Sequence, residues 1–340
     1  MEASKETLAG NTSKQKVRYF LRLLISIVAF VCLIKFGKVD LKTASKYILQ
    51  VNPTYFILAY LCYLTTNSLA AVRFHFSSHA LGFRKNYSQL LQLIFVGAFF
   101  NNFLPTTVGG DALRGYYLKK GSHVSISKAA ACIAYERYTG MIVLFWLTSA
   151  AFILQDMGII NKSAWQVPHE LAVFCHISSI ITIFIVPFIP QINTLIFGKS
   201  NWVYKKIIEP IIIFWKDLKL VTNVLLLSMI LQIFVIVCHY FIAQSLNIQI
   251  PLTYYLVFYP LTTLAGFIIP SLNGLGIREG AYIYFLKQVN VSTDQGLAFS
   301  ICWLIILFIT SIIGGLIYLF GDFRKHKHLE AEQQVKVMQS

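Results

Sequence analysis

The chain has 340 residues, of which 56% are hydrophobic and only 13% are charged, and its formal net charge is +15. A soluble domain carries about 25% charged residues, so this composition excludes a soluble globular protein and indicates a helical protein that crosses a membrane several times. In such a protein Lys and Arg flank the spans and meet anionic headgroups, so the positive charge does not imply nucleic acid as a partner.

Apolar segments of near-spanning length follow one another along most of the chain. A polar stretch at 1–16, expected to be a disordered cytoplasmic N-terminus, precedes one transmembrane domain at 17–320, and a cytoplasmic tail at 321–340 follows. The apolar segments are Val17–Phe36, Pro53–Val72, Tyr87–Leu104, Ile126–Leu154, Leu171–Ile189, Leu220–Leu246, Tyr254–Ile269 and Gly296–Phe320. Between them, 198–219 mixes aromatic and Lys residues as a helix at the membrane surface does.

Two of the apolar segments are interrupted by proline, glycine and charge. The first interruption reads NNFLPTTVGGDALR over residues 101–114, and the second reads PSLNGLGIREG over residues 270–280. Proline removes a backbone donor and glycine admits turns that side chains forbid, so both sites are expected to act as hinges. Two broken segments in corresponding positions of two halves indicate a transporter binding site. The predicted hinge residues are Pro105, Gly109, Gly110, Pro270, Gly274 and Gly276.

Charged and amide side chains accompany these breaks and the helix that follows the first. Charge is costly in hydrocarbon unless it is paired or faces water, which makes these residues candidates for substrate binding. Because neighbours on a helix point about 100° apart, Glu136 and Arg137 each need their own partner. Glu136 could pair with Arg114 or Arg278, and Arg137 could pair with Asp111 or Glu279. The candidate substrate-binding residues are Asn102, Asp111, Arg114, Glu136, Arg137, Arg278 and Glu279.

The distribution of Lys and Arg bears on how many segments cross the membrane. If all eight segments crossed, most basic loops would lie outside the cell, which inverts the positive-inside rule. If the two broken segments are re-entrant, the loops around 73–85, 106–128 and 199–219 lie inside together with both termini. We therefore predict six full spans plus two re-entrant segments, in an inverted repeat of about 17–155 and 171–320. Eight full spans is the alternative.

Other potential site residues support plainer interpretations. His75 and His79 have the i,i+4 spacing of metal ligands, but no third ligand accompanies them, so no metal site is predicted. His176 and His239 stand alone in apolar segments and are expected to be hydrogen-bond partners in the core. No CxxC, GxSxG, HExxH or Walker pattern is present, so no cofactor is expected and an enzyme is the less favoured class.

Three motifs together resemble a known family. NNFLPTTVGGDALR, the YER of residues 135–137 and PSLNGLGIREG are similar to the transmembrane domain of lysylphosphatidylglycerol synthase/flippase proteins, which also occurs alone in flippase-like membrane proteins. The resemblance covers about residues 15–325 and implies an eight-segment domain that moves a lipid between leaflets. Full-length synthases continue into a soluble aminoacyl-transfer domain, and this chain stops at Ser340, so lysyl transfer by this polypeptide alone is not expected.

The sequence thus favours a lipid flippase-like transporter of the inner or plasma membrane. Its substrate would be a phospholipid or a polyprenyl- or glycan-linked lipid, and its partners would be anionic membrane lipids, with a lipid-synthesising enzyme as a further candidate partner. One alternative is a membrane enzyme of aminoacyl-phosphatidylglycerol synthesis, with Glu136 or Asp111 as general base. Another is a non-catalytic scaffold subunit. Without an ATP-binding motif, transport would be facilitated or coupled to an ion.

Overall fold

The computed structural model describes residues 40–103, 109–160, 167–185, 214, 217–268 and 274–321. These residues form helices joined by turns and short connections, with no strand among them, which confirms the predicted all-helical class. Within this part of the chain, four helices are long and apolar enough to cross a membrane. They are α3 (Pro53–Ala80), α6 (Ile126–Asp156), α10 (Leu218–Ser245) and α13 (Thr293–Phe320).

Polar caps set where these long helices begin. Asn52 accepts a hydrogen bond from the backbone nitrogen of Thr54 at 3.0 Å, immediately before the first residue of α3. Ser292 and Gln295 exchange side-chain and backbone hydrogen bonds at the start of α13. Such caps satisfy backbone donors that have no partner inside a helix. The sequence prediction ended the second span at Val72, whereas α3 continues for two further turns, which places Arg73 inside the helix.

The two interrupted segments each form a pair of shorter helices. The first pair is α4 (Tyr87–Phe103) and α5 (Gly109–Lys119), and the second is α11 (Tyr255–Ile268) and α12 (Ile277–Lys287). The longest of these has 17 residues and reaches about 25 Å, less than the ~30 Å of a bilayer's hydrocarbon core. None of the four is therefore long enough to cross a membrane by itself.

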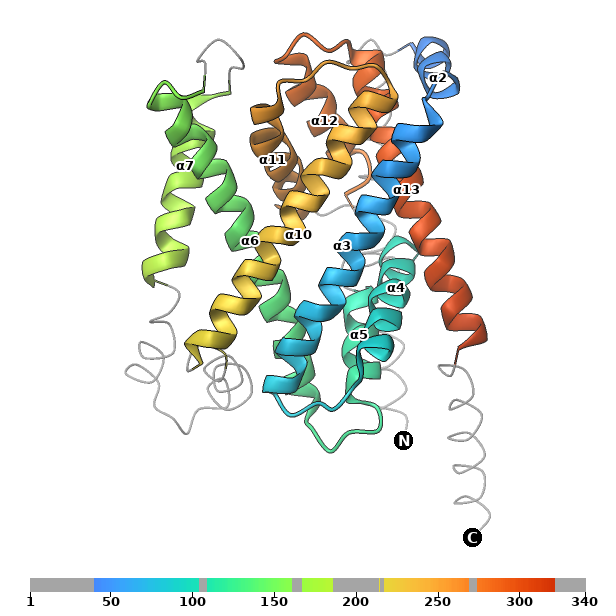
Figure 1. The fold of residues 1–340 in the computed structure, drawn as a ribbon, viewed down its shortest axis with the longest axis vertical. Helices are drawn as coiled ribbons and strands as arrows, with labels where there is room; N and C mark the ends of the chain where they lie inside the picture. Colours follow the sequence, from blue (N-terminus) through green and yellow to red (C-terminus); the bar gives the residue numbers. More distant parts are fainter. Residues whose placement is uncertain are drawn as a thin grey trace, which may run out of the picture.

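Each pair is a hairpin that begins and ends at the same end of the molecule. Lys85, just before α4, donates a hydrogen bond to the carbonyl oxygen of Lys120, just after α5, at 2.8 Å. In the second pair, the hydroxyl of Tyr254 donates to the carbonyl oxygen of Phe285 near the end of α12, also at 2.8 Å. The first hairpin lies in the lower half of the view and the second in the upper half (Figure 1). This is the arrangement expected of two re-entrant segments that enter from opposite faces.

Smaller elements complete the described part. Helix α7 (His169–Ile180) runs into a π-helical turn, η1 (Ile181–Ile185), and the short 3-10 turn η4 (Leu252–Tyr254) precedes α11. Helix α2 (Leu41–Leu49) lies against the start of α13, where the backbone nitrogen of Asp40 donates to Asp294 at 2.8 Å. The predicted N-terminus, first span and surface helix, most of the tail, Pro105 and Pro270 lie wholly or largely outside the described residues.

Helix α4 is held between α5 and α13 by glycines that bring backbones close together. A Cβ atom added to Gly314 of α13 would lie 2.0 Å from the carbonyl oxygen of Phe95, and one added to Gly110 of α5 would lie 2.1 Å from that of Gly97. Both contacts are with backbone, which has little freedom to move. The close approach of three helices around the first hairpin therefore depends on the absence of side chains at these positions.

We expect Gly314→Ala to lower the thermal unfolding midpoint of the purified protein by several degrees. The new methyl group would force α4 and α13 apart, and overpacking of this kind costs about 1–3 kcal/mol. Gly115→Ala is the matched control, because it is also in a helix but its Cβ would meet only the tip of the Ile133 side chain, at 3.3 Å. Equal midpoints for Gly314→Ala and the wild type would contradict the close helix contact.

Candidate functional site

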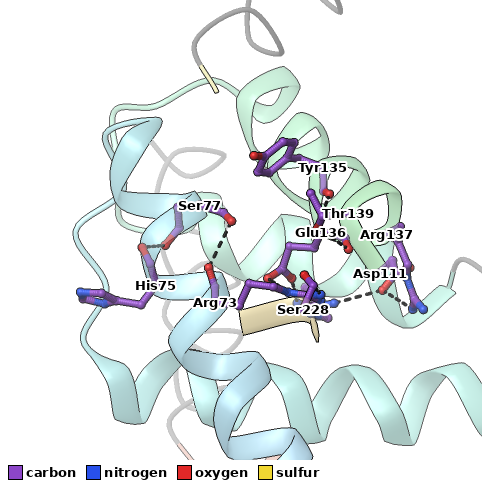
Figure 2. Close-up of polar contacts among 11 residues, drawn as sticks. Arg73, His75, Ser77, Asp111, Tyr135, Glu136, Arg137, Thr139 and Ser228 are labelled. Carbon is purple, nitrogen blue, oxygen red and sulfur yellow. Dashed lines mark hydrogen bonds and ion pairs between the residues drawn. The ribbon is translucent and has the colours of Figure 1, made fainter. Parts of the chain in front are cut away.

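The carboxylate of Glu136, on α6, lies at the centre of a buried ion network (Figure 2). One oxygen accepts a hydrogen bond from the Arg114 guanidinium of α5 at 2.7 Å. The other oxygen lies 3.5 Å from Nε of Arg73 on α3. Only 3% of the Glu136 side chain is exposed, so these two guanidinium groups take the place of water around its charge.

Asp111 extends the network to a third guanidinium group. Its two oxygens accept hydrogen bonds from Nε and Nη2 of Arg137 at 2.9 and 3.0 Å, a bidentate arrangement. Nη1 of Arg114 lies 3.4 Å from the same carboxylate. Asp111 also stands in the first turn of α5, where a negative charge is favoured by the helix dipole. The order along the network is Arg137, Asp111, Arg114, Glu136 and Arg73.

The surroundings of the network fix its position in the fold. The Arg114 guanidinium lies over the ring of Phe74 at 4.5 Å, and the Arg114 stem fills the space beside Gly97, where a Cβ atom would come within 2.5 Å of it. Arg73 donates a further hydrogen bond to the hydroxyl of Ser228 on α10 at 2.9 Å. The network therefore joins α3, α5, α6 and α10, next to the glycine contacts of α4.

Three arginines and two carboxylates leave these five residues with a net charge of 3 − 2 = +1. The side chains differ in their contact with solvent: that of Arg114 is 9% exposed, whereas that of Arg137 is 42% exposed. The positive end of the network at Arg137 is thus the part that an outside molecule can reach. An anion is the ligand that this charge balance favours.

The second break presents a different arrangement, at the start of α12. Gly274 and Gly276 have φ of +80° and +82°, the left-handed conformation that glycine adopts without strain. One oxygen of Glu279 accepts a hydrogen bond from the Gly276 backbone nitrogen at 2.5 Å and caps the helix. Its other oxygen lies 3.5 Å from Nη2 of Arg278.

Several polar atoms at this second break have no hydrogen-bond partner. Nε and Nη2 of Arg278 and the Oε1 atom of Glu279 are buried, and no described residue makes a hydrogen bond to them. Buried polar groups in proteins are nearly always paired, and each unpaired one costs about 1–3 kcal/mol. The first network also contains such atoms, at Nε of Arg73 and Nε of Arg114, but its charged groups are paired between helices. Among the described residues Arg278 is paired only with its chain neighbour Glu279, which leaves its donors for a ligand.

The structure places the predicted site residues in two groups. Asp111, Arg114, Glu136 and Arg137 come together, whereas Arg278 and Glu279 stay at the second break. Of the two partners considered for Glu136, the observed one is Arg114. Asn102 instead joins the first hairpin to α13, where its amide donates to the hydroxyl of Ser311. Of the predicted hinges, Gly109 and Gly110 open α5, and Gly274 and Gly276 precede α12.

Sequence reasoning missed Arg73 because it was taken as the end of a span. The signal was present in Phe74 and Phe76, which continue the apolar pattern beyond it. His75 and His79 follow Arg73 in the same helix, two and six residues later, and their ring centroids lie 3.9 Å apart. Throughout the described residues no group of three His, Cys, Asp or Glu side chains is placed to hold a metal ion.

These features define a helical membrane protein with two short hairpins at opposite ends, an ion network that joins several helices beside one and a buried Arg–Glu pair at the break of the other. The family model described as the lysylphosphatidylglycerol synthase TM region matches residues 19–315, and the chain belongs to that family.

Two archaeal proteins of Methanocaldococcus jannaschii are similar to this chain along most of their own length. The UPF0104 membrane protein MJ1595 is 21% identical over 342 residues, which cover 89% of this chain and 95% of the relative. The UPF0104 membrane protein MJ1078 is 28% identical over 237 residues, which cover 65% of this chain and 93% of the relative. Both names describe membrane proteins, in agreement with the composition and the apolar helices.

We expect Glu136→Gln to destabilise the protein by about 3–5 kcal/mol, because it leaves Arg73 buried without its ion-pair partner and Arg114 with Asp111 as its one remaining carboxylate among the described residues. The measurement is the thermal unfolding midpoint of the purified protein in detergent. Glu170→Gln on α7 removes an exposed carboxylate and serves as the control. If the two variants unfolded at the same temperature, Glu136 would not carry the energetic role that the contacts assign to it.

Proposed function

We propose that the protein moves an anionic lipid between the two leaflets of a cell membrane. The observation that carries this proposal is the buried guanidinium of Arg278 at the second break, two of whose nitrogen atoms make no hydrogen bond with any described residue. A phosphodiester oxygen is a suitable acceptor for such donors, since the guanidinium plane matches its geometry. The family to which the chain belongs is described as the lysylphosphatidylglycerol synthase TM region, which supports a lipid as the substrate.

Within this proposal the arginines have different roles. Arg114 contacts two carboxylates and the ring of Phe74, and its role in this proposal is to position α5 against α6. Arg137 and Arg278 are the cations proposed to meet the phosphate, one from each hairpin region. Asp111 holds Arg137 in place. Glu279 caps α12, lies beside Arg278 and would face any cationic part of the headgroup.

Two hairpins at opposite ends suit alternating access to one headgroup site. Broken helices that meet within the bilayer let polar backbone and side chains line a cavity without facing lipid. A lipid could then pass its headgroup from one hairpin to the other while its acyl chains stay in hydrocarbon. Transport in the inner or plasma membrane, and a lipid-synthesising enzyme as partner, belong to the same proposal.

A modifying enzyme is the weaker proposal for this site. Asp111 and Glu136, the two carboxylates considered as general bases, are both engaged by guanidinium groups within 3.5 Å. A carboxylate held in such ion pairs is a poor acceptor for a substrate proton.

A scaffold role would use the same network only to hold helices together, and it predicts no dependence of lipid movement on Arg278.

We expect Arg278→Gln to slow translocation of fluorescently labelled phosphatidylglycerol in proteoliposomes by about tenfold, the equivalent of about 1.4 kcal/mol. Dithionite quenching of the label in the outer leaflet measures the rate. Arg137→Gln should slow it as well, and Lys287→Gln, an exposed cation on the same helix as Arg278, is the control. Translocation at the wild-type rate by a folded Arg278→Gln variant would contradict the headgroup role.

A further inference from the structure

A line of polar residues runs along one face of α10 between the two breaks. Ser228, Gln232 and His239 are four and seven residues apart, the spacing that places side chains on one face of a helix. Ser228 accepts the hydrogen bond from Arg73 at the first site. Gln232 accepts one from the hydroxyl of Tyr259 at 2.7 Å. The line ends at His239, which belongs neither to the ion network nor to the proposed headgroup site at Arg278.

The hydrogen bonds of His239 assign its protonation state. Its Nδ1 atom lies 2.7 Å from the carbonyl oxygen of Val235, which can only accept, so Nδ1 carries the hydrogen. Its Nε2 atom lies 2.7 Å from the hydroxyl of Tyr282 on α12 and accepts from it. The imidazole is therefore neutral, and its basic nitrogen faces the helix that begins at the second break.

Aromatic rings surround His239 and would offset part of the cost of a positive charge on this buried ring. Its ring centroid lies 4.5 Å from that of Trp303, 4.7 Å from that of Tyr259 and 5.9 Å from that of Phe299. The faces of aromatic rings attract cations, most strongly where water is excluded. His239 itself is fully buried, so these rings and Tyr282 would stabilise a proton that burial alone would disfavour.

The charged groups near His239 connect it to the second break. Arg278 precedes Tyr282, the hydrogen-bond partner of His239, by four residues on α12, so its guanidinium lies on the same face of that helix and opposes a second positive charge nearby. Glu279 precedes Tyr282 by three residues on α12, so the two share a face of that helix. Helix α13 presents Phe299 and Trp303, which do not titrate. The titratable and charged groups facing this region are Arg278, Glu279 and Tyr282 from α12, Tyr259 from α11, and Cys62 and Tyr63 from α3.

We propose that His239 binds a proton together with the anionic headgroup at Arg278, which makes the proton the ion coupled to lipid movement. This inference rests on the proposed function. An anion beside Arg278 cancels the positive charge that opposes a proton on His239. Because coupling between two ligands is reciprocal, a proton on His239 strengthens anion binding by the same factor. One proton also balances the single negative charge of a phosphodiester.

The test uses the full chain in phosphatidylcholine vesicles with labelled phosphatidylglycerol and a pH-sensitive dye inside. For the wild type we expect translocation to accelerate by about fivefold or more between about pH 8 and about pH 6, with proton movement that requires the lipid. The direction follows because falling pH loads His239 and so favours the anion. In His239→Gln the acceleration and the proton signal should vanish while slow translocation persists at about pH 8.

Two further variants keep the outcome interpretable. Tyr282→Phe removes the hydroxyl that faces Nε2 and should shift the pH dependence while leaving the histidine in place. His176→Gln on α7 removes a histidine that is hydrogen-bonded to Ser149 and should behave as the wild type. Wild-type translocation with no pH dependence and no proton signal would overturn the proton inference alone. Absence of protein-dependent translocation at every pH would overturn the proposed function, and the proton inference with it.

Discussion

The ion pairs of the Glu136 carboxylate with Arg114 and Arg73 are the interactions on which the first half of the described structure depends. A single buried carboxylate or guanidinium is expensive inside a membrane, and only partners from other helices can offset that cost. The partners here come from α3 and α5, so the three helices must approach one another closely. The glycines at 97, 110 and 314 bring α4 equally close to α5 and α13 beside this network, since a Cβ at any of them would collide with a neighbour.

The two hairpins share a pattern of sequence but differ in electrostatics. At the first, every charged group has a partner, and Asn102 ties the hairpin to α13. At the second, Glu279 caps its own helix, and Arg278 has donors that make no hydrogen bond with a described residue. Ion pairs between helices hold a fixed arrangement, whereas donors without a partner are stabilised when a ligand accepts their hydrogen bonds. Helix α10 contacts both regions, through Ser228 at the first network and through His239 at α12.

Local chemistry explains what could be predicted from the sequence. Hydrophobic length located α6 and α10 within two residues or fewer of their ends, and proline and glycine located both breaks. The bidentate pair of Asp111 and Arg137 was among the partners considered. Partners far apart in the chain were not predictable: Arg73 and Ser228 are separated by 155 residues, and His239 and Tyr282 by 43. Such contacts depend on how helices pack, which hydropathy and turn chemistry do not specify.

The proposed headgroup site at Arg278 is tested most directly by mass spectrometry of the lipids that co-purify with the protein. The wild type and Arg278→Gln would be extracted from the same membrane and compared with the bulk lipid profile. We expect one class of anionic phospholipid to be enriched on the wild type and lost from Arg278→Gln. Lipid profiles that match the bulk membrane for both proteins would contradict a headgroup site at the second hairpin.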